Sequence, residues 1–242
     1  MSLLALMYHR ARAGPQGNAP AMLDAHFAHI AGRYTCALPG EPLDPRRLNI
    51  CLTFDDAYFD FYAVVFPLLE KHNLRALLAV PPVVVREEVA APACDRLTQE
   101  SDVNHNHPNY GGFCTWPELR ELAQSGRVAI AAHGFTHCPL DREGVDLHAE
   151  IVVPQALLAA RLGHAVQSFV FPYGRFSPVA LERVRGHYRH AFRIGGADNS
   201  GWDRQPLYRI DADGLAAPDA PFTAARRTTY RARHFWNRLR GR

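Results

Sequence analysis

Two adjacent carboxylates follow an apolar run in the first quarter of the chain. Asp55 and Asp56 come after residues 50–54, a segment typical of a buried strand. We therefore expect both at the carboxyl-terminal end of that strand, where α/β barrels build their active sites. Because sequence neighbours point in different directions there, one carboxylate can bind a metal ion while the other faces the bound water, as metal-assisted hydrolysis requires. The alternative is that the pair caps a helix beginning near Tyr58.

A pair of histidines forms the second chemical pattern. His133 and His137 follow the apolar segment 128–132 and stand four residues apart. Their imidazoles can converge on one cation if the chain turns helically after the strand. The alternative is an incidental spacing, because the chain holds 13 histidines. Two imidazoles with one carboxylate would leave coordination positions open, which a catalytic metal site needs.

The tetrapeptide Phe171-Pro172-Tyr173-Gly174 is the third pattern and follows another strand-like run. Glycine permits a close approach of the backbone, and proline fixes the turn. A backbone N–H in such a turn could stabilise an oxyanion. A tight turn without a catalytic role is the alternative.

Strands and helices alternate along the chain that must position these groups. Apolar runs predict strands at 3–9, 48–54, 76–80, 128–133, 168–171 and 191–194, and helical patterns lie at 22–33, 58–72, 116–125, 147–162 and 178–187. This order is typical of a parallel sheet, open or closed into a barrel. A length of 242 residues with 48% hydrophobic residues favours one α/β domain. The long irregular stretch 86–114 is expected to form a lid or a wall of the substrate site.

Composition argues against several other classes of protein. The five cysteines are scattered without a C-x-x-C pattern, so neither a disulfide framework nor a four-cysteine zinc module is expected. The longest apolar stretch, 76–85, contains two prolines and is too short for a membrane-spanning helix. The apolar residues 3–7 are too few for a secretion signal, so we expect a cytoplasmic location.

Taken in order, the three patterns resemble those of the polysaccharide deacetylase family, the NodB-homology carbohydrate esterases. T-F-D-D at 53–56, H-G-F-T-H at 133–137 and F-P-Y-G at 171–174 match the first three motifs of that family. The resemblance implies an α/β fold: a distorted (β/α) barrel of about seven parallel strands in a single domain, over residues 1–222. It also implies a divalent metal ion, most often zinc, and hydrolysis of an N-acetyl or O-acetyl group on a sugar.

The resemblance assigns roles to individual residues. It implies that Asp55 is the general base and that Asp56, His133 and His137 are the metal ligands. The backbone at Tyr173 would help to hold the oxyanion. Substrate contacts are expected at the other residues of that motif, Phe171, Pro172 and Gly174.

The chain departs from the family pattern around the third and fourth motifs. Ala57 replaces the usual glycine, and the arginine that commonly steadies the base is absent from the segment before Phe171. Arg175 is a candidate to substitute for it, and the sequence leaves open which residue does so. No late histidine motif follows Gly174.

The start of the chain offers a histidine in place of the late motif. Residues 6–10, Leu-Met-Tyr-His-Arg, resemble the opening of the circularly permuted exopolysaccharide deacetylases, which implies His9 as the general acid. His105 and His107 could form an accessory metal or substrate contact, and a solvated loop is the alternative there.

Together these features predict a metal-dependent carbohydrate N-deacetylase of surface polysaccharide or lipopolysaccharide biosynthesis. Its expected partner is an acetylated sugar or glycan, and we do not expect it to bind nucleic acid. A cyclic amide or imide hydrolase of the same family is one alternative, and a non-catalytic carbohydrate-binding scaffold is the other.

Residues 223–242 form an arginine-rich tail. Residues 226–242 hold seven arginines and no acid, which leaves 20 of the chain's 27 basic residues against 24 acidic residues in the remainder. Three aromatic residues, Tyr230, Phe235 and Trp236, lie among the arginines. The tail could attract anionic lipid headgroups and so make a peripheral contact with the inner membrane face, or it could attract a pyrophosphate-bearing substrate. A disordered solubilising tail is the alternative.

Overall fold

A computed structural model describes residues 2–99, 101, 103, 111–203 and 205–239 of the chain. His105 and His107, the alternative metal or substrate contacts, lie outside the described residues.

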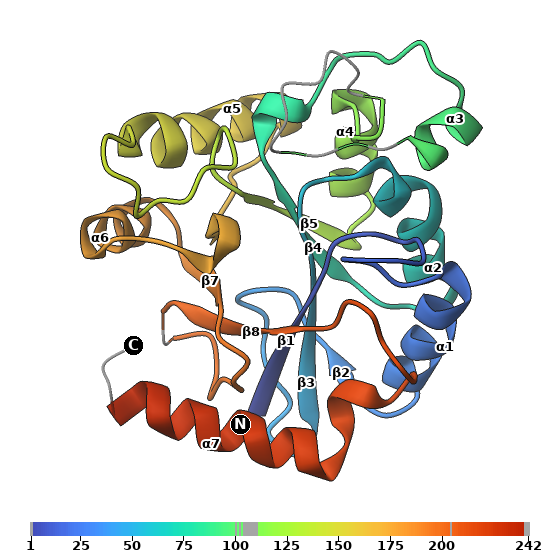
Figure 1. Cartoon of the computed structure of the whole chain (residues 1–242), viewed down its shortest axis with the longest axis vertical. Helices are drawn as coiled ribbons and strands as arrows, with labels where there is room; N and C mark the ends of the chain where they lie inside the picture. The colour runs from blue at the N-terminus through green and yellow to red at the C-terminus, as the bar shows by residue number, and fades with distance from the viewer. Residues whose placement is uncertain (1, 100, 102, 104–110, 204, 240–242) are drawn as a thin grey trace.

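Seven parallel strands close into one barrel (Figure 1), which confirms the predicted fold. The barrel strands, in pairing order, are β1 (Ser2–Tyr8), β3 (Leu48–Phe54), β4 (Ala76–Val80), β5 (Val128–Ala132), β6 (Ser168–Val170), β7 (His190–Ile194) and β8 (Leu207–Asp211). Strand β1 pairs with β3 along its whole length and with β8 on its other side, so the first strand closes the ring. The two-residue β2 (Thr35–Cys36) adds to β3 outside the ring.

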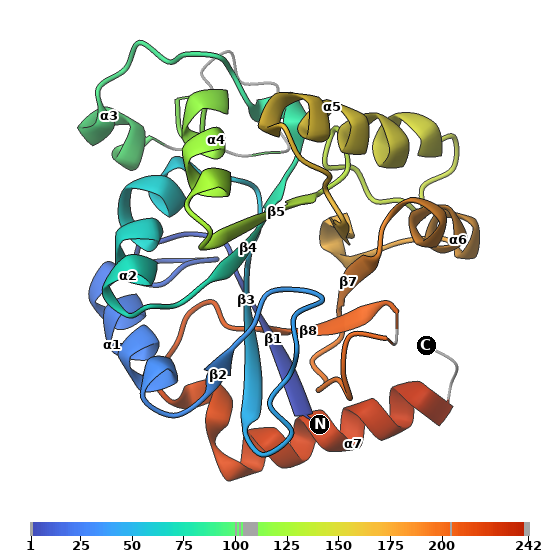
Figure 2. The same ribbon diagram turned by 180° about the vertical axis from the view of Figure 1, so that it is seen from behind.

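Helices surround the barrel (Figures 1 and 2). They are α1 (Pro20–Ala31), α2 (Phe66–Lys71), α3 (Ala93–Thr98), α4 (Trp116–Gln124), α5 (Val153–Leu162), α6 (Pro178–His187) and α7 (Ala224–Leu239). Two of the predicted helices begin with a π-helical turn. The predicted helix 58–72 consists of η1 (Phe61–Val65) followed by α2, and the predicted helix 147–162 consists of η3 (His148–Val152) followed by α5. Short 3₁₀ turns, η2 (Pro82–Val84), η4 (Pro172–Gly174) and η5 (Ala220–Phe222), complete the helical elements. None of the helices in the described ranges is long and apolar enough to cross a membrane.

The barrel interior is packed mainly with apolar side chains, both small and large. Alternate residues of each strand point inward because side chains in a strand alternate between its faces, and the inward set includes Ala5, Cys51, Ala79 and Ala131. The outward-facing side chains belong to a cluster with more residues, which packs beneath the helices. Inward-facing groups of different strands therefore meet in one packed interior.

The arginine-rich segment is helical over residues 224–239 rather than disordered, and α7 runs along one edge of the molecule (Figure 1). Tyr230 is buried against the hydrophobic core, and His234 Nδ1 donates a hydrogen bond of 2.8 Å to the Asp198 carbonyl. These contacts fix one side of the helix to the barrel.

One buried arginine fastens the long segment between β4 and α4. Arg96 of α3 donates to both carboxylate oxygens of Glu118, at 2.6 and 2.9 Å, and to the carbonyls of Gly111 and Phe113. Glu118 also accepts a hydrogen bond from the Thr115 N–H at the start of α4, as part of a capping box. The same ion pair thus fixes the segment and the helix that follows it.

We expect the substitution Arg96→Met to lower the free energy of unfolding by about 3–5 kcal/mol, because it leaves the Glu118 carboxylate poorly solvated and without its cation. Equilibrium urea unfolding measures the change. The matched control is Arg175→Met, which breaks a pair with Asp141 in which the arginine is 58% exposed, and it should cost less than about 1 kcal/mol. Equal losses in the two variants would contradict this account.

Candidate active site

The two-residue period of the strands brings the candidate site together at the carboxyl-terminal end of the barrel. On β3 the inward series that holds Cys51 and Thr53 continues to Asp55. On β5 the series that holds Ala131 continues to His133, and on β1 the series through Met7 continues to His9. Each side chain therefore leaves its strand pointing toward the same axis.

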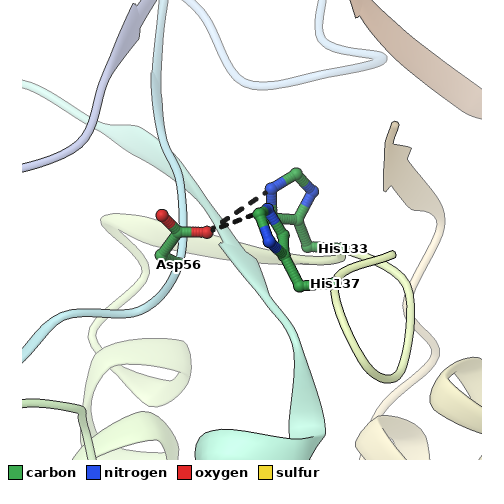
Figure 3. Close-up of side chains that lie close together, drawn as sticks. All are labelled: Asp56, His133 and His137. Atoms are coloured by element: carbon green, nitrogen blue, oxygen red, sulfur yellow. Dashed lines mark ion pairs between the residues drawn. The ribbon is translucent and has the colours of Figure 1, made fainter. Parts of the chain in front are cut away.

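Three side chains form a group with the composition of a metal site (Figure 3). Asp56 Oδ1 lies 3.6 Å from His133 Nε2 and 3.3 Å from His137 Nε2. One ligand atom from each of the three buried residues lies within 4.8 Å of the others. Asp56 reaches this position through a backbone φ of 74°, which turns its carboxylate away from that of Asp55. One carboxylate and two imidazoles are ligands that divalent transition metals bind, so this donor set fits such an ion.

The two imidazoles are neutral, as metal ligands must be. His133 Nδ1–H donates to the Val170 carbonyl at 2.8 Å, which leaves Nε2 facing Asp56. Burial lowers the pKa of His133 to about 4. Burial, together with the neighbouring His133 ring, also holds the pKa of His137 far below its usual value.

The loop that carries the histidines is held by a buried glutamate. Residues 133–137 do not form the helical turn that the spacing suggested; left-handed backbone at Gly134 and His137 turns the second imidazole back toward the first. Glu150 of η3 accepts hydrogen bonds from the N–H groups of Phe135 and Thr136 and from the Thr136 hydroxyl. A Cβ at Gly134 would lie 2.9 Å from the Glu150 carboxylate. This position therefore favours glycine both for its left-handed backbone and for the lack of room for a side chain.

The arginine that steadies Asp55 comes from β8. Arg209 Nη1 donates to Asp55 Oδ1 at 2.6 Å, and the arginine is 1% exposed. The candidate substitute, Arg175, is wrong: its guanidinium is exposed and pairs with Asp141. Burial tends to raise the pKa of Asp55, but Arg209, with help from His133, holds that pKa below the usual range of a carboxyl group.

His9 occupies the other side of the site. Its Nδ1–H donates to Asp213 Oδ2 at 2.5 Å, and its backbone N–H donates to the other oxygen of the same carboxylate. Its Nε2 lies 3.9 Å from Asp55 Oδ2. Burial lowers the pKa of His9, but the hydrogen bond to Asp213 and the charge of Asp55 outweigh it and raise the pKa to about 9. This imidazole therefore carries two protons at neutral pH.

The turn η4 places Tyr173 at the mouth of the site. Tyr173 has a left-handed φ of 57°, and its half-exposed ring packs 4.8 Å from the ring of His137. Phe171 is fully buried and packs against Phe176, so its side chain supports the turn from below. Substrate contact by Phe171, Pro172 and Gly174 stays a prediction.

A cavity of about 1000 Å³ opens above these residues. The proposed base, acid and metal ligands all line it, and so does Tyr173. Ser101 and Val103 belong to the long segment 86–114 and also line it, so this segment forms part of the wall, as the sequence suggested.

Sequence reasoning missed three residues that hold the site: Arg209, Asp213 and Glu150. Arg209 and Asp213 lie in or just after β8, for which the sequence analysis predicted no strand. One signal in the sequence could have indicated an inward-facing arginine. In residues 207–211 every second side chain shares a face of the strand, so Arg209 lies on the same face as Leu207 and Asp211. Glu150 lies in a helical pattern and looks like an ordinary surface residue.

Several known proteins resemble this chain. A curated relative, the poly-β-1,6-N-acetyl-D-glucosamine N-deacetylase of Escherichia coli K12, is 35% identical over 96 residues, which cover 39% of this chain and 12% of that protein. The match thus spans about an eighth of the relative's length.

Solved structures share the fold at low sequence identity. The Streptococcus pyogenes deacetylase PplD in complex with acetate has a TM-score of 0.71 and 20% identity, over 91% of this chain and 96% of that one. IcaB from Ammonifex degensii has a TM-score of 0.69 and 19% identity, over 93% and 97% of the two chains. A de-N-acetylase from Aggregatibacter actinomycetemcomitans has a TM-score of 0.70 and 20% identity, over 88% and 95%.

The family model for polysaccharide deacetylases matches residues 44–188, which include β3 to α6 and the three motifs. Because this match covers more than half of the chain, the protein belongs to the polysaccharide deacetylase family.

Proposed function

We propose that this protein is a metal-dependent hydrolase that removes the acetyl group from an N-acetylated sugar. The observation that carries the proposal is the placement of two differently charged groups around one donor set. Asp55, an ionised carboxylate, and His9, a protonated imidazole, both lie beside the three residues that fit a metal ion. Such a pair can accept one proton and donate another within the same cavity.

Asp56, His133 and His137 would hold the ion, for which we propose zinc because three nitrogen and oxygen ligands with an open position suit it. When bound, this ion would polarise the acetyl carbonyl and acidify a water molecule.

Asp55 is proposed to take the proton from the attacking water. Its Oδ1 is occupied by Arg209, while its Oδ2 faces His9 and His133, at 3.9 and 3.8 Å. The arginine therefore fixes the carboxylate in one orientation and keeps it ionised. The same arginine supplies the steadying group that is absent before Phe171, which favours a catalytic site over a non-catalytic scaffold.

His9 is proposed to protonate the departing amine as the C–N bond breaks. An amine leaves poorly as an anion, so a proton donor at this place lowers the barrier. Asp213 accepts from Nδ1 and thereby leaves the Nε2 proton facing the cavity. The products are acetate and a sugar with a free amino group.

The cavity is open and wide enough for a sugar, and the backbone at Tyr173 is proposed to help stabilise the oxyanion. An acetylated glycan is the proposed substrate class, by analogy with the name of the E. coli relative. A panel that includes small cyclic amides and imides separates this proposal from the alternative hydrolase. A role in surface polysaccharide or lipopolysaccharide biosynthesis and a cytoplasmic location stay predictions.

Substitutions of the two adjacent aspartates should have different effects on activity and on bound metal. We expect Asp55→Asn to reduce acetate release by at least roughly 10²-fold, because proton removal is lost, while bound metal measured by atomic emission stays near the wild-type level. Asp56→Asn should lose metal and activity together, because it removes a ligand. Loss of metal from the Asp55 variant with retention in the Asp56 variant would show that the two roles are exchanged.

The role of His9 can be separated by the leaving group. His9→Ala should slow hydrolysis of an N-acetyl sugar by roughly 10²- to 10⁴-fold, and it should slow hydrolysis of an aryl acetate far less, because a phenolate leaves without a proton. Both rates are measured on metal-loaded protein. His187→Ala, which removes another histidine late in the chain, is the control and should change neither rate. Equal losses on the two substrates would refute His9 as the general acid.

Asp213 should set the alkaline limit of the reaction. Because Asp213 raises the pKa of His9, the group stays protonated, and the acid stays active, until the pH rises through that pKa. Asp213→Asn weakens this effect, so we expect the alkaline limb of the pH–rate profile to move to lower pH with metal content unchanged. An unmoved limb would show that the limb does not report His9.

A further inference from the structure

Helix α7 turns an apolar face toward solvent. Successive residues of an α-helix are 100° apart around its axis, which places Tyr230 and His234 on the side that contacts the barrel. Phe235, Trp236 and Leu239 lie on the opposite side and are 61%, 57% and 64% exposed. The remaining residues of that outer face are small: Ala224, Ala225, Thr228, Thr229 and Ala232.

Arginines border this outer face on both sides. On the same projection Arg227 and Arg231 follow one edge of the face, and Arg226 and Arg233 follow the other. The helix contains five arginines and no acidic residue. An apolar strip between two rows of cations is the pattern of helices that lie in a lipid interface, where arginines reach headgroup phosphates and aromatic rings enter the acyl boundary.

The helix lies away from the catalytic cavity. In both views α7 runs beside the point where the chain begins and β1 starts (Figures 1 and 2), whereas the candidate site lies where β1 ends. A flat surface could therefore meet the outer face of α7 while the cavity stays open.

We propose that the outer face of α7 is a docking surface for an anionic lipid bilayer. The arginines supply attraction to anionic headgroups, and burial of the two aromatic rings and Leu239 supplies the apolar part of the binding energy. A free diphosphate would satisfy the arginines but would leave the apolar strip in water, so the bilayer is the better match. The helix would lie on the membrane, since it is not apolar enough to cross one.

The fluorescence of Trp236 provides a direct test on the full chain. The other two tryptophans, Trp116 and Trp202, are buried, so Trp236 is the exposed indole. Adding vesicles of phosphatidylglycerol and phosphatidylcholine should shift the emission to shorter wavelength, and vesicles of phosphatidylcholine alone should have much less effect. Flotation of the protein with the same vesicles gives a measure that does not depend on the indole.

Variants test the two parts of the surface separately. Replacing both Arg231 and Arg233 by Gln should lower partitioning to the anionic vesicles roughly 30-fold, from about a five-fold loss for each cation near the surface. Phe235→Ser with Leu239→Ser should abolish flotation. Val179→Ser removes an equally exposed apolar side chain on α6 and is the matched control. Thermal unfolding confirms that each variant is folded, and acetate release should be unchanged in all of them.

Three results would overturn the proposal. The first is wild-type protein that does not float with anionic vesicles. The second is binding that survives the serine substitutions, which would mean that the arginines bind anions without the apolar strip. The third is an emission shift that depends on protein concentration without vesicles and accompanies dimerisation, which would show that a second copy of the chain covers this face.

Discussion

The ion pair between Arg209 and Asp55 sits inside a barrel whose interior is lined mainly by apolar side chains. Both groups are almost completely buried, so each charge would be costly to bury without the other. For the pair to form, β8 must lie beside β1, which itself lies beside β3, and that order exists only because the barrel closes. The geometry of the site thus depends on ring closure as much as on the motifs.

A second carboxylate–cation pair balances the first across the cavity. Arg209 keeps Asp55 in its basic form, and Asp213 keeps His9 in its acidic form. The two pairs approach each other where His9 Nε2 faces Asp55 Oδ2. Because each charge has its own partner, the proposed base and acid can stand close together without exchanging their proton in the resting state. Asp56 and the two neutral histidines form the remaining donor set, which fits a divalent ion.

The short motifs were sufficient to predict which side chains come together and which strands precede them. Asp56, His133 and His137 converge, but left-handed backbone at Gly134 and His137, and not the expected helical turn, brings the second imidazole back toward the first. Arg209 escaped prediction because an arginine in a short segment normally indicates an exposed strand, and only closure of the barrel turns it inward. Helix α7 escaped because a run of arginines without acids lacks the i,i+4 pairs that stabilise a helix locally. Its stability comes from tertiary contacts of Tyr230 and His234.

The place of His9 at the start of the chain also follows from closure. If the ring were open between β1 and β8, these two strands would lie at opposite edges of the sheet, and a histidine after β1 would be far from a carboxylate after β8. In the closed barrel β1 lies between β8 and β3, so His9 lies between Asp213 and Asp55. His9 and Asp213 are 204 residues apart in the sequence. A ring of parallel strands has no preferred starting strand for the site it builds. The order of motifs along the chain can therefore change while the arrangement of base, acid and ligands around the axis stays the same.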